Sequence, residues 1–313
     1  MLLDSIYIII GLALLYYGGD LLISGSLRIA QAFKISPFVI GATVMGFGTS
    51  APELSVSLLA AFQGSPEISI GNVIGSNIAN IGLVLGLTAF LVPLTIEQKI
   101  LRRETPPLLI ATFLILFLTW DNELGRWEGI LLLAGVVLYT WRAFRVKDEP
   151  SSTLESEGGY FINKGIAYQF LLIVAGLILL VAGAKAMVEG GVNIARAFGI
   201  SEWFIGISII AVGTSLPEII SSLMSAFRGH GEMALGNVFG SNIFNILMVL
   251  GATATAKPLK VLEVIHPDLL FTTGLTCLLL VLIRLEHNLS KRDGVILLTA
   301  YVGYIASKAT GIM

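Results

Sequence analysis

The sequence contains one long internal repeat, which limits the possible folds more than any other feature. Residues 40–86 read IGATVMGFGTSAPELSVSLLAAFQGSPEISIGNVIGSNIANIGLVLG, and residues 205–251 read IGISIIAVGTSLPEIISSLMSAFRGHGEMALGNVFGSNIFNILMVLG. The segments align without a gap at an offset of 165 residues (205 − 40), and more than half of the aligned positions are identical. The same offset relates GLALL at 11–15 to GLILL at 176–180, so the repeat unit covers about half of the chain.

The chain is too apolar for a soluble globular protein. Hydrophobic residues make up 55% of it and charged residues only 13%, about half the usual charged fraction of a soluble domain. We therefore predict an all-α polytopic membrane protein with ten transmembrane helices, because the apolar residues fall in runs about long enough to cross a bilayer. These runs cover 5–27, 38–62, 68–92, 105–120, 129–146, 165–187, 203–227, 233–255, 268–285 and 294–310.

Each repeat contains five of these runs, and this odd number determines how the two copies are arranged. After five crossings the second copy starts from the opposite side of the membrane, so a pseudo-two-fold axis in the membrane plane relates the copies. We expect a first five-helix repeat over 1–146, a polar linker over 147–164, and a second, inverted repeat over 165–313.

The distribution of basic residues predicts the orientation. Most of the 19 Lys and Arg residues lie in or beside the loops on the linker's side, although this bias comes from the first half of the chain. Basic loops are enriched on the cytoplasmic side. We therefore expect a multi-pass protein of the cell membrane with a cytoplasmic linker and both termini extracellular.

Each repeat carries a glutamate near the middle of a predicted membrane helix: Glu53 in GTSAPE at 48–53 and Glu218 in GTSLPE at 213–218. A charge at the bilayer centre is energetically costly, so such a residue faces protein, water or an ion. Protonated glutamates that only pack against neighbours are the alternative. Repeated hydroxyl residues beside both glutamates favour a cation site: Thr49, Ser50, Thr214 and Ser215.

A proline directly precedes each glutamate, at Pro52 and Pro217. Proline has no N–H, so the carbonyl four residues earlier loses its helical partner. We expect the nearby carbonyls of Gly46 and Ala211 to be loosened as well. A simple helix kink is the alternative, but irregular backbone at this depth persists only where it lines a cavity or is buried in protein.

A second polar segment reads GNVIGSNIAN at 71–80 and GNVFGSNIFN at 236–245. Polar residues spaced by four lie on one face of a helix. Such a face can bind a cation, or it can join helices by hydrogen bonds while glycines allow close contact. We favour the residues nearer mid-span as ligands: Ser76, Asn80, Ser241 and Asn245. Both interpretations remain open for Asn72, Asn77, Asn237 and Asn242.

All of these candidate ligands are oxygen atoms. The absence of His and Cys at these depths disfavours zinc, copper and iron–sulfur chemistry. Carboxylate, carbonyl and hydroxyl oxygens suit Ca²⁺, which accepts six to eight flexible oxygen ligands. One Ca²⁺ would neutralise Glu53 and Glu218, and Na⁺ could compete for the same oxygens. Mutually exclusive occupancy of this kind is the physical basis of antiport.

The paired GTSxPE and GNVxGSNIxN segments resemble the two α-repeats of the calcium/cation antiporter superfamily, most closely its sodium/calcium exchanger branch. The resemblance covers essentially the whole chain. It implies ten helices, with helices two, three, seven and eight broken around the ion sites, and exchange of Na⁺ for Ca²⁺ by alternating access. By motif position it implies side-chain ligands from Glu53, Glu218, Thr49, Ser50, Ser76, Asn80, Thr214, Ser215, Ser241 and Asn245, with backbone oxygens of Gly46 and Ala211.

The sequence departs from some relatives at Asn245, where potassium-dependent members carry Asp. An amide cannot supply that charge, which disfavours potassium co-transport. The proton/calcium branch has GNxxE in place of GTSxPE, so Ca²⁺/H⁺ exchange is the alternative function rather than the first expectation.

We also weighed an intramembrane enzyme and a channel. An enzyme would need a nucleophile and a base, and no His or membrane-embedded Lys lies near the Thr, Ser and Glu residues. A channel would place such groups in a ring around a pore axis. We expect no enzymatic activity, no cofactor, no nucleic-acid partner and no obligatory protein partner, with Ca²⁺ and Na⁺ as substrates in a lipid bilayer.

Overall fold

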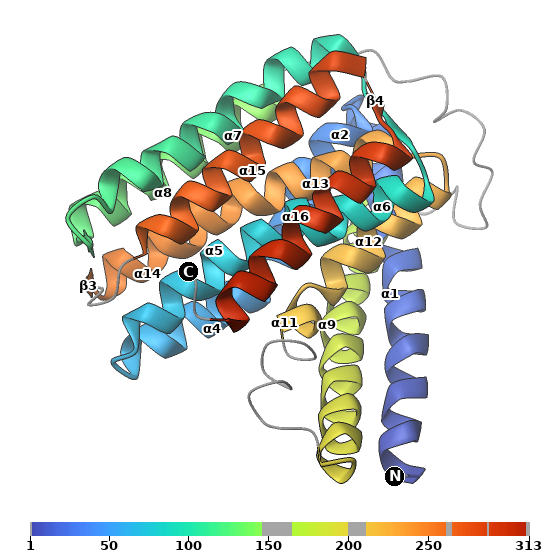
Figure 1. Ribbon diagram of the computed structural model, residues 1–313. Coiled ribbons are helices and arrows are strands. Elements are labelled where there is room, and N and C mark those ends of the chain that lie inside the picture. The colour runs from blue at the N-terminus through green and yellow to red at the C-terminus, as the bar shows by residue number, and fades with distance from the viewer. Residues whose placement is uncertain (1, 146–164, 200–210, 261–264, 287, 311–313) are drawn as a thin grey trace.

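The computed structural model describes residues 2–145, 165–199, 211–260, 265–286 and 288–310, most of them helical (Figure 1). The expected linker at 147–164 and the first part of the run at 203–227 lie outside the described residues. In chain order the elements are α1 (Leu2–Phe33), α2 (Pro37–Ile40), η1 (Gly41–Met45), α3 (Gly46–Thr49), α4 (Ala51–Phe62), α5 (Pro66–Ala79), η2 (Asn80–Leu85), α6 (Gly86–Leu91), β1 (Leu94–Thr95), α7 (Gln98–Leu118), β2 (Glu123–Leu124), α8 (Arg126–Arg145), α9 (Ile166–Ala197), α11 (Ala211–Thr214), α12 (Leu216–Phe227), α13 (Gly231–Phe244), η5 (Asn245–Leu250), α14 (Gly251–Ala256), β3 (Leu259–Lys260), α15 (His266–Glu286), β4 (Asn288–Leu289) and α16 (Lys291–Ala309), where η marks a π-helical segment.

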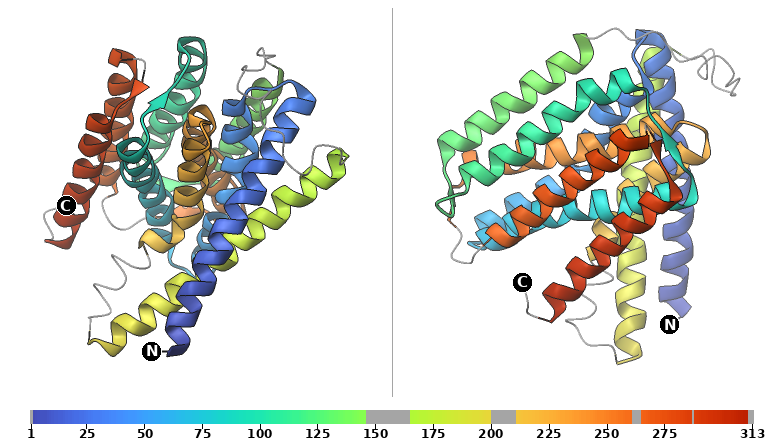
Figure 2. Two further views of the ribbon diagram at one scale, coloured as in Figure 1. Left: turned by 90° about the vertical axis from the view of Figure 1, so that its right-hand side faces the viewer. Right: turned by 45° about the horizontal axis from the view of Figure 1, so that its top comes forward.

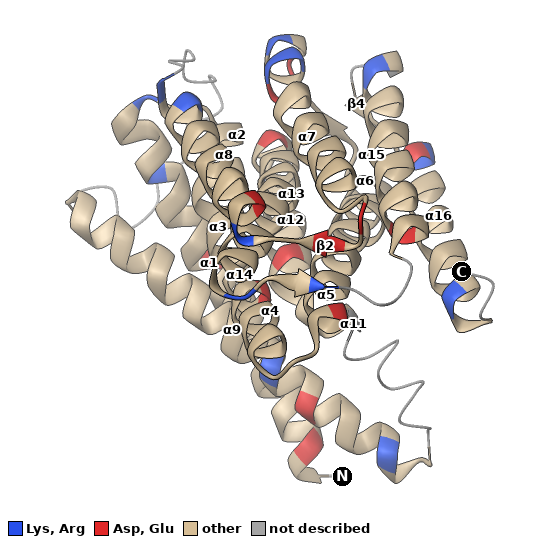
Figure 3. Ribbon diagram, turned by 90° about the vertical axis from the view of Figure 1, so that its left-hand side faces the viewer, with Lys and Arg blue, Asp and Glu red and all other residues tan. Residues whose placement is uncertain are grey.

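Six helical stretches in the described chain are long and apolar enough to cross a membrane: Leu2–Phe33, Pro66–Leu91, Arg126–Arg145, Ile166–Ala197, Gly231–Ala256 and His266–Leu285. The other predicted runs are also helical where they are described. Turns interrupt the helices of two of these runs, 38–62 and 203–227. The helices of the other two runs, α7 and α16, carry several charged residues. Lys and Arg lie mostly at helix ends, with long uncharged stretches between them (Figure 3).

The outer faces of the helices are apolar. Large hydrophobic side chains such as those of Ile110, Phe117 and Val137 are exposed on α7 and α8. An exposed apolar surface of this extent suits contact with lipid, which cannot hydrogen-bond to polar side chains. The predicted membrane class is therefore consistent with the surface as well as with the helix lengths.

The helices beside the predicted glutamates are interrupted. α3 ends before Ser50, and α4 begins with Pro52 in its first turn; α11 and α12 repeat this arrangement around Ser215 and Pro217. Proline fits the first turn of a helix because its missing N–H would have no helical partner there. The predicted breaks in the second and seventh runs are present.

The third and eighth runs differ from the expectation of broken helices. Each is one continuous helix, and a π-helical segment widens it at η2 and η5. Neither run has a proline inside the helix, so its backbone hydrogen bonds can continue through the wider turn. These two helices lie at the centre of the molecule, and the hydrophobic stretch of Gly231–Ala256 is completely buried.

Two small antiparallel sheets connect the halves of the chain. Leu94 of β1 lies opposite Leu289 of β4, and Leu124 of β2 lies opposite Leu259 of β3. The two pairings are equivalent under the offset of the repeat, since 94 + 165 is 259 and 124 + 165 is 289. Each sheet therefore joins a strand of the first half to a strand of the second.

α1 and α9 pack against each other over most of their length and run steeply across the other helices (Figures 1 and 2). Glycines allow this close approach. A Cβ atom added at Gly11 would lie 2.8 Å from the Gly183 carbonyl oxygen, and one at Gly18 would lie 2.9 Å from the Gly176 carbonyl oxygen. These two contacts are again equivalent under the repeat offset, since 11 + 165 is 176 and 18 + 165 is 183.

Candidate cation site

The two glutamates lie in equivalent positions, each in the first turn of a helix that restarts inside the molecule. Glu53 belongs to α4 and is 2% exposed; Glu218 belongs to α12 and is 1% exposed. Glu218 is close enough to Glu53 for the two carboxyl groups to interact electrostatically. The N-terminus of a helix favours negative charge, so each interruption gives its carboxylate a favourable position.

Several buried oxygens of the predicted ligand set have no hydrogen-bond partner among the described residues. They are Ser50 Oγ, Glu53 Oε2, Asn80 Oδ1, Asn245 Oδ1 and both carboxyl oxygens of Glu218. Leaving a buried polar atom unsatisfied usually costs about 1–3 kcal/mol, and charged groups cost more. Other unpartnered atoms, such as those of Ser26 and Tyr139, are scattered elsewhere. The elements that carry the ligand-set oxygens pack against one another, α4 against η5 and α12 against η2, which fits a group of oxygens that bind a cation.

Asn80 and Asn245 are held by hydrogen bonds between the halves of the chain. Asn80 Nδ2 donates to Asn242 Oδ1 over 3.1 Å, and Asn245 Nδ2 donates to Asn77 Oδ1 over 3.1 Å. Because each amide nitrogen makes a hydrogen bond in this way, each amide oxygen stays available as a possible cation ligand. Asn77 and Asn242, which the sequence left undecided, therefore orient the two amides.

Asn72 and Asn237 join neighbouring helices. Asn72 Nδ2 donates to the Glu53 carbonyl oxygen over 3.2 Å and to Ser57 Oγ over 2.9 Å. Asn237 Nδ2 donates to Ser221 Oγ and Ser222 Oγ, both over 2.9 Å. These contacts favour the structural interpretation of both asparagines, because they fix α4 against α5 and α12 against α13.

Sequence reasoning missed the serines that accept these bonds. Ser57 and Ser222 are identical in the two copies and lie four residues after the glutamates. A polar residue repeated one turn beyond a buried carboxylate was the signal that could have identified them.

The hydroxyl residues of the two halves lie in different surroundings. Thr49 Oγ1 is 3.1 Å from Ser241 Oγ, and both side chains are fully buried. Their counterparts, Thr214 and Ser76, line a cavity of about 170 Å³. Ser215, Tyr301 and Tyr304 also line this cavity.

The helix contacts next to these hydroxyls differ in the same way. A Cβ atom at Gly46 would lie 2.8 Å from the Ser241 nitrogen, and one at Gly240 would lie 2.1 Å from the Ala42 carbonyl oxygen, so the first half is tightly packed against α13. Among the described residues, which do not include 200–210, no atom lies within 4 Å of the corresponding Cβ position at Gly75. Only the helical backbone of Ala211, at the start of α11, is described.

Known proteins with similar sequences identify the family of this chain. The sequence model of a family described as "Sodium/calcium exchanger protein" matches residues 4–145 and 168–309, which is nearly all of the chain. The chain belongs to the sodium/calcium exchanger family. This membership confirms the resemblance inferred from the repeated motifs.

Two relatives in the family match over nearly their full lengths. The "Putative antiporter CaxA" of Alkalimonas amylolytica is 38% identical, over 97% of this chain and 98% of the relative. The sodium/calcium exchanger MaX1 of Methanosarcina acetivorans is 31% identical, over 96% of this chain and 97% of the relative.

A solved structure of the sodium-calcium exchanger NCX_Mj, soaked with Na⁺ and Ca²⁺, has the same fold. It is 36% identical, with a TM-score of 0.83 over 98% of this chain and 99% of that chain. A structure of the same exchanger without Na⁺ and Ca²⁺ gives a TM-score of 0.84 at 35% identity. The helical membrane fold predicted for the exchanger family is therefore confirmed.

Proposed function

We propose that this chain is a secondary antiporter that exchanges Na⁺ for Ca²⁺ at the buried site around Glu53 and Glu218. The observation that carries the proposal is the gathering of two buried carboxylates with unpartnered amide and hydroxyl oxygens. Family membership and the relatives named sodium/calcium exchangers support the same ions.

The proposed ligand set contains the side chains Glu53, Glu218, Thr49, Ser50, Ser76, Asn80, Thr214, Ser215, Ser241 and Asn245, with the backbone oxygens of Gly46 and Ala211. One Ca²⁺ balances the charge of the two carboxylates and prefers this type of oxygen ligand. Na⁺ ions at the same oxygens exclude Ca²⁺, because both loads need the same two negative charges. The site therefore holds either Ca²⁺ or Na⁺ at any one time.

The proposed architecture has ten membrane crossings in two inverted repeats, 1–146 and 165–313, joined by the linker at 147–164. The exchanged contacts support it: the two sheets, the glycine contacts of α1 and α9, and the two asparagine pairs each recur with the halves interchanged. A two-fold axis between the halves produces this pattern.

Alternating access is supported by the difference between the halves. Thr49 and Ser241 are sealed by close helix packing, whereas Ser76 and Thr214 line a cavity beside the last turns of α16. The last turns of α16 lie at the end of the molecule where α1 begins, so this is the end nearest to the two chain termini (Figure 1). In the predicted orientation, with both termini extracellular, the site is therefore reached from outside the cell.

The test is uptake of ⁴⁵Ca²⁺ into Na⁺-loaded proteoliposomes by the wild type, Glu53→Gln and Glu218→Gln. We expect both amide variants to lose exchange, because each removes one of the two charges that Ca²⁺ needs. Glu97→Gln, at an exposed residue before α7, is the matched control and should exchange normally. Wild-type rates in either site variant would contradict the proposed site, and uptake driven by a proton gradient without Na⁺ would favour Ca²⁺/H⁺ exchange.

A further inference from the structure

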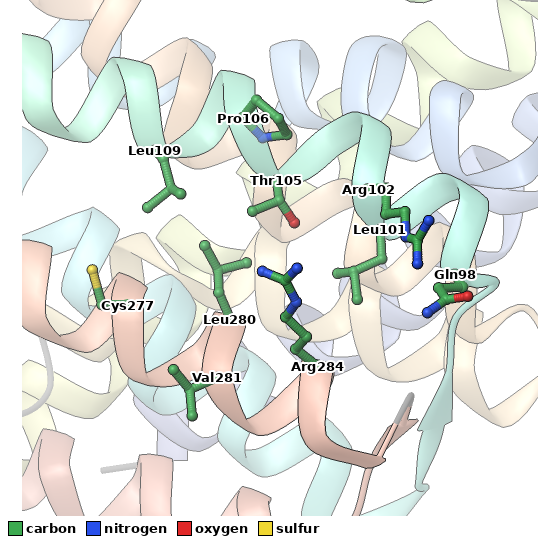
Figure 4. A pocket seen from close by; sticks show the side chains of 10 residues that line it. All are labelled: Gln98, Leu101, Arg102, Thr105, Pro106, Leu109, Cys277, Leu280, Val281 and Arg284. Atoms are coloured by element: carbon green, nitrogen blue, oxygen red, sulfur yellow. The ribbon is translucent and has the colours of Figure 1, made fainter.

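A second candidate ligand site lies between α7 and α15, away from the glutamates. Its cavity measures about 470 Å³. Figure 4 shows the side chains that line it, which come from one face of each helix: Gln98, Leu101, Arg102, Thr105, Pro106, Leu109, Cys277, Leu280, Val281 and Arg284. We call this cavity the α7–α15 groove.

The polar and apolar parts of the groove are separated along the helices. Arg102, near the start of α7, and Arg284, near the end of α15, lie at one end, and the Arg284 side chain extends towards α7 (Figure 4). Leu109 and Cys277 lie at the other end. Arg102 and Leu109 are seven residues apart, so the apolar part extends about 10 Å beyond the arginines at 1.5 Å per helical residue.

The charges of the groove favour an anion. Among the described residues, no acidic side chain lines the groove, and neither Arg102 nor Arg284 forms an ion pair. The neighbouring Arg103 differs, because it is paired with the buried Glu104 at 2.5 Å. The two arginines therefore present guanidinium groups that can bind a phosphate through paired hydrogen bonds.

The groove also opens to the apolar surface of the molecule. Val281 is 53% exposed, and Ile110 beside Leu109 is 64% exposed. Both arginines lie at helix ends, next to β1 and β4, where a helix leaves the hydrocarbon region of the membrane. A ligand that fits here has an anionic phosphate at the membrane surface and a hydrocarbon chain directed into the bilayer.

We propose that the α7–α15 groove binds one anionic phospholipid, whose phosphate lies between Arg102 and Arg284 and whose acyl chain lies along Leu109 and Cys277. Basic pockets between membrane helices recognise such head groups. This assignment is independent of ion exchange, because no proposed cation ligand lines the groove.

The test uses the full chain, delipidated in detergent and titrated with dioleoyl phosphatidylglycerol or dioleoyl phosphatidylcholine, with bound lipid counted by native mass spectrometry. The wild type should bind phosphatidylglycerol more tightly. Arg102→Gln with Arg284→Gln should weaken that binding about 30-fold, the effect of two basic contacts near a membrane surface. Lys291→Gln with Arg292→Gln removes the same charge at the exposed start of α16, outside the groove, and should keep the preference.

A second variant tests the apolar part without changing charge. Val281→Trp fills the groove at an exposed position that tolerates a large side chain, and it should weaken binding of both lipids. An unchanged phosphatidylglycerol preference in the double arginine variant would overturn the proposal. Full displacement of the lipid by excess glycerol phosphate would also overturn it, because the groove would then be a simple anion site.

Discussion

At the scale of single residues, the proposed cation site includes side chains that hold two proposed ligands in place. Asn77 Oδ1 and Asn242 Oδ1 each accept a hydrogen bond from the amide nitrogen of a proposed ligand in the other half of the chain. The repeated motifs predicted the ligands Asn80 and Asn245 by position. They could not assign Asn77 and Asn242, because a spacing along one helix does not reveal which residue of another helix lies opposite.

Removal of this orientation should weaken the site without removing a ligand. In Asn77→Ala the Asn245 amide loses its acceptor and can rotate, so we expect the Ca²⁺ concentration for half-maximal exchange to rise about fivefold, the effect of one net hydrogen bond. The measurement is the Ca²⁺ dependence of ⁴⁵Ca²⁺ uptake. Asn288→Ala, at the start of β4, is the control, since that amide lies far along the chain from the site. An unchanged Ca²⁺ dependence in Asn77→Ala would mean that Asn77 has no orienting role.

One ion pair between the two halves has no counterpart at the positions related by the repeat. Arg228, just after α12, contacts Asp20 of α1 and donates to Ser24 Oγ over 3.2 Å. The positions related to Asp20 and Arg228 by the repeat offset hold Lys185 and Gln63, which cannot form an ion pair. The sequence does not reveal that Asp20 pairs with Arg228, because Arg228 lies in a loop of the other half of the chain.

This pair should contribute little to stability. Both side chains are partly exposed, and such pairs usually contribute at most about 1 kcal/mol. We expect Asp20→Asn to lower the midpoint of thermal unfolding in detergent by only a few degrees, with Asp121→Asn in an exposed turn as the control. A large loss of stability would show that Asp20 has a further structural role.

At the scale of helices, the apolar runs predicted where each helix lies in the chain more accurately than they predicted the residues at which it begins and ends. α7 begins at Gln98, although the apolar run begins only at 105, because its first turns carry charges that hydropathy does not assign to a membrane helix. Proline predicted the interruptions before Glu53 and Glu218. The π-helical segments at Asn80 and Asn245 had no comparable local signal, since they depend on how the helix fits its neighbours.

The contact between α1 and α9 is specified by small residues, which gives a sharp test. A Cβ atom at Gly18 would lie 2.8 Å from the Leu180 backbone nitrogen, whereas no atom of the described residues lies within 4 Å of the Cβ position at Gly303 in α16. We expect Gly18→Leu to separate the two helices, lower the unfolding temperature and abolish exchange. Gly303→Leu should leave both measurements unchanged, and equal behaviour of the two variants would contradict this packing role.

At the scale of the whole molecule, the sequence predicts two inverted copies, because each copy has five predicted spans, and the strand pairs formed between the halves are consistent with that arrangement. The two copies are so similar that the sequence could not predict why, among the described residues, Thr49 contacts Ser241 while Ser76 and Thr214 line a cavity.

The open side can be tested by chemical labelling. The chain contains one cysteine, Cys277, so Cys277→Ser provides a cysteine-free background. In that background Gly71→Cys, which lines the open cavity, should react faster with a membrane-impermeant thiol reagent added outside the cell than with the same reagent added to inverted vesicles. Faster reaction in inverted vesicles would reverse the assigned direction of access.

The pairing of strands between the two halves also affects the order in which the protein can fold during synthesis. β1 is complete once residue 95 has been synthesised, yet its partner β4 starts only at residue 288. The first half therefore leaves the ribosome with both of its strands unpaired, and these gain their partners only as the second half is synthesised. We expect a chain truncated before β4 to leave β1 without its partner, so that one of the two sheets joining the halves cannot form.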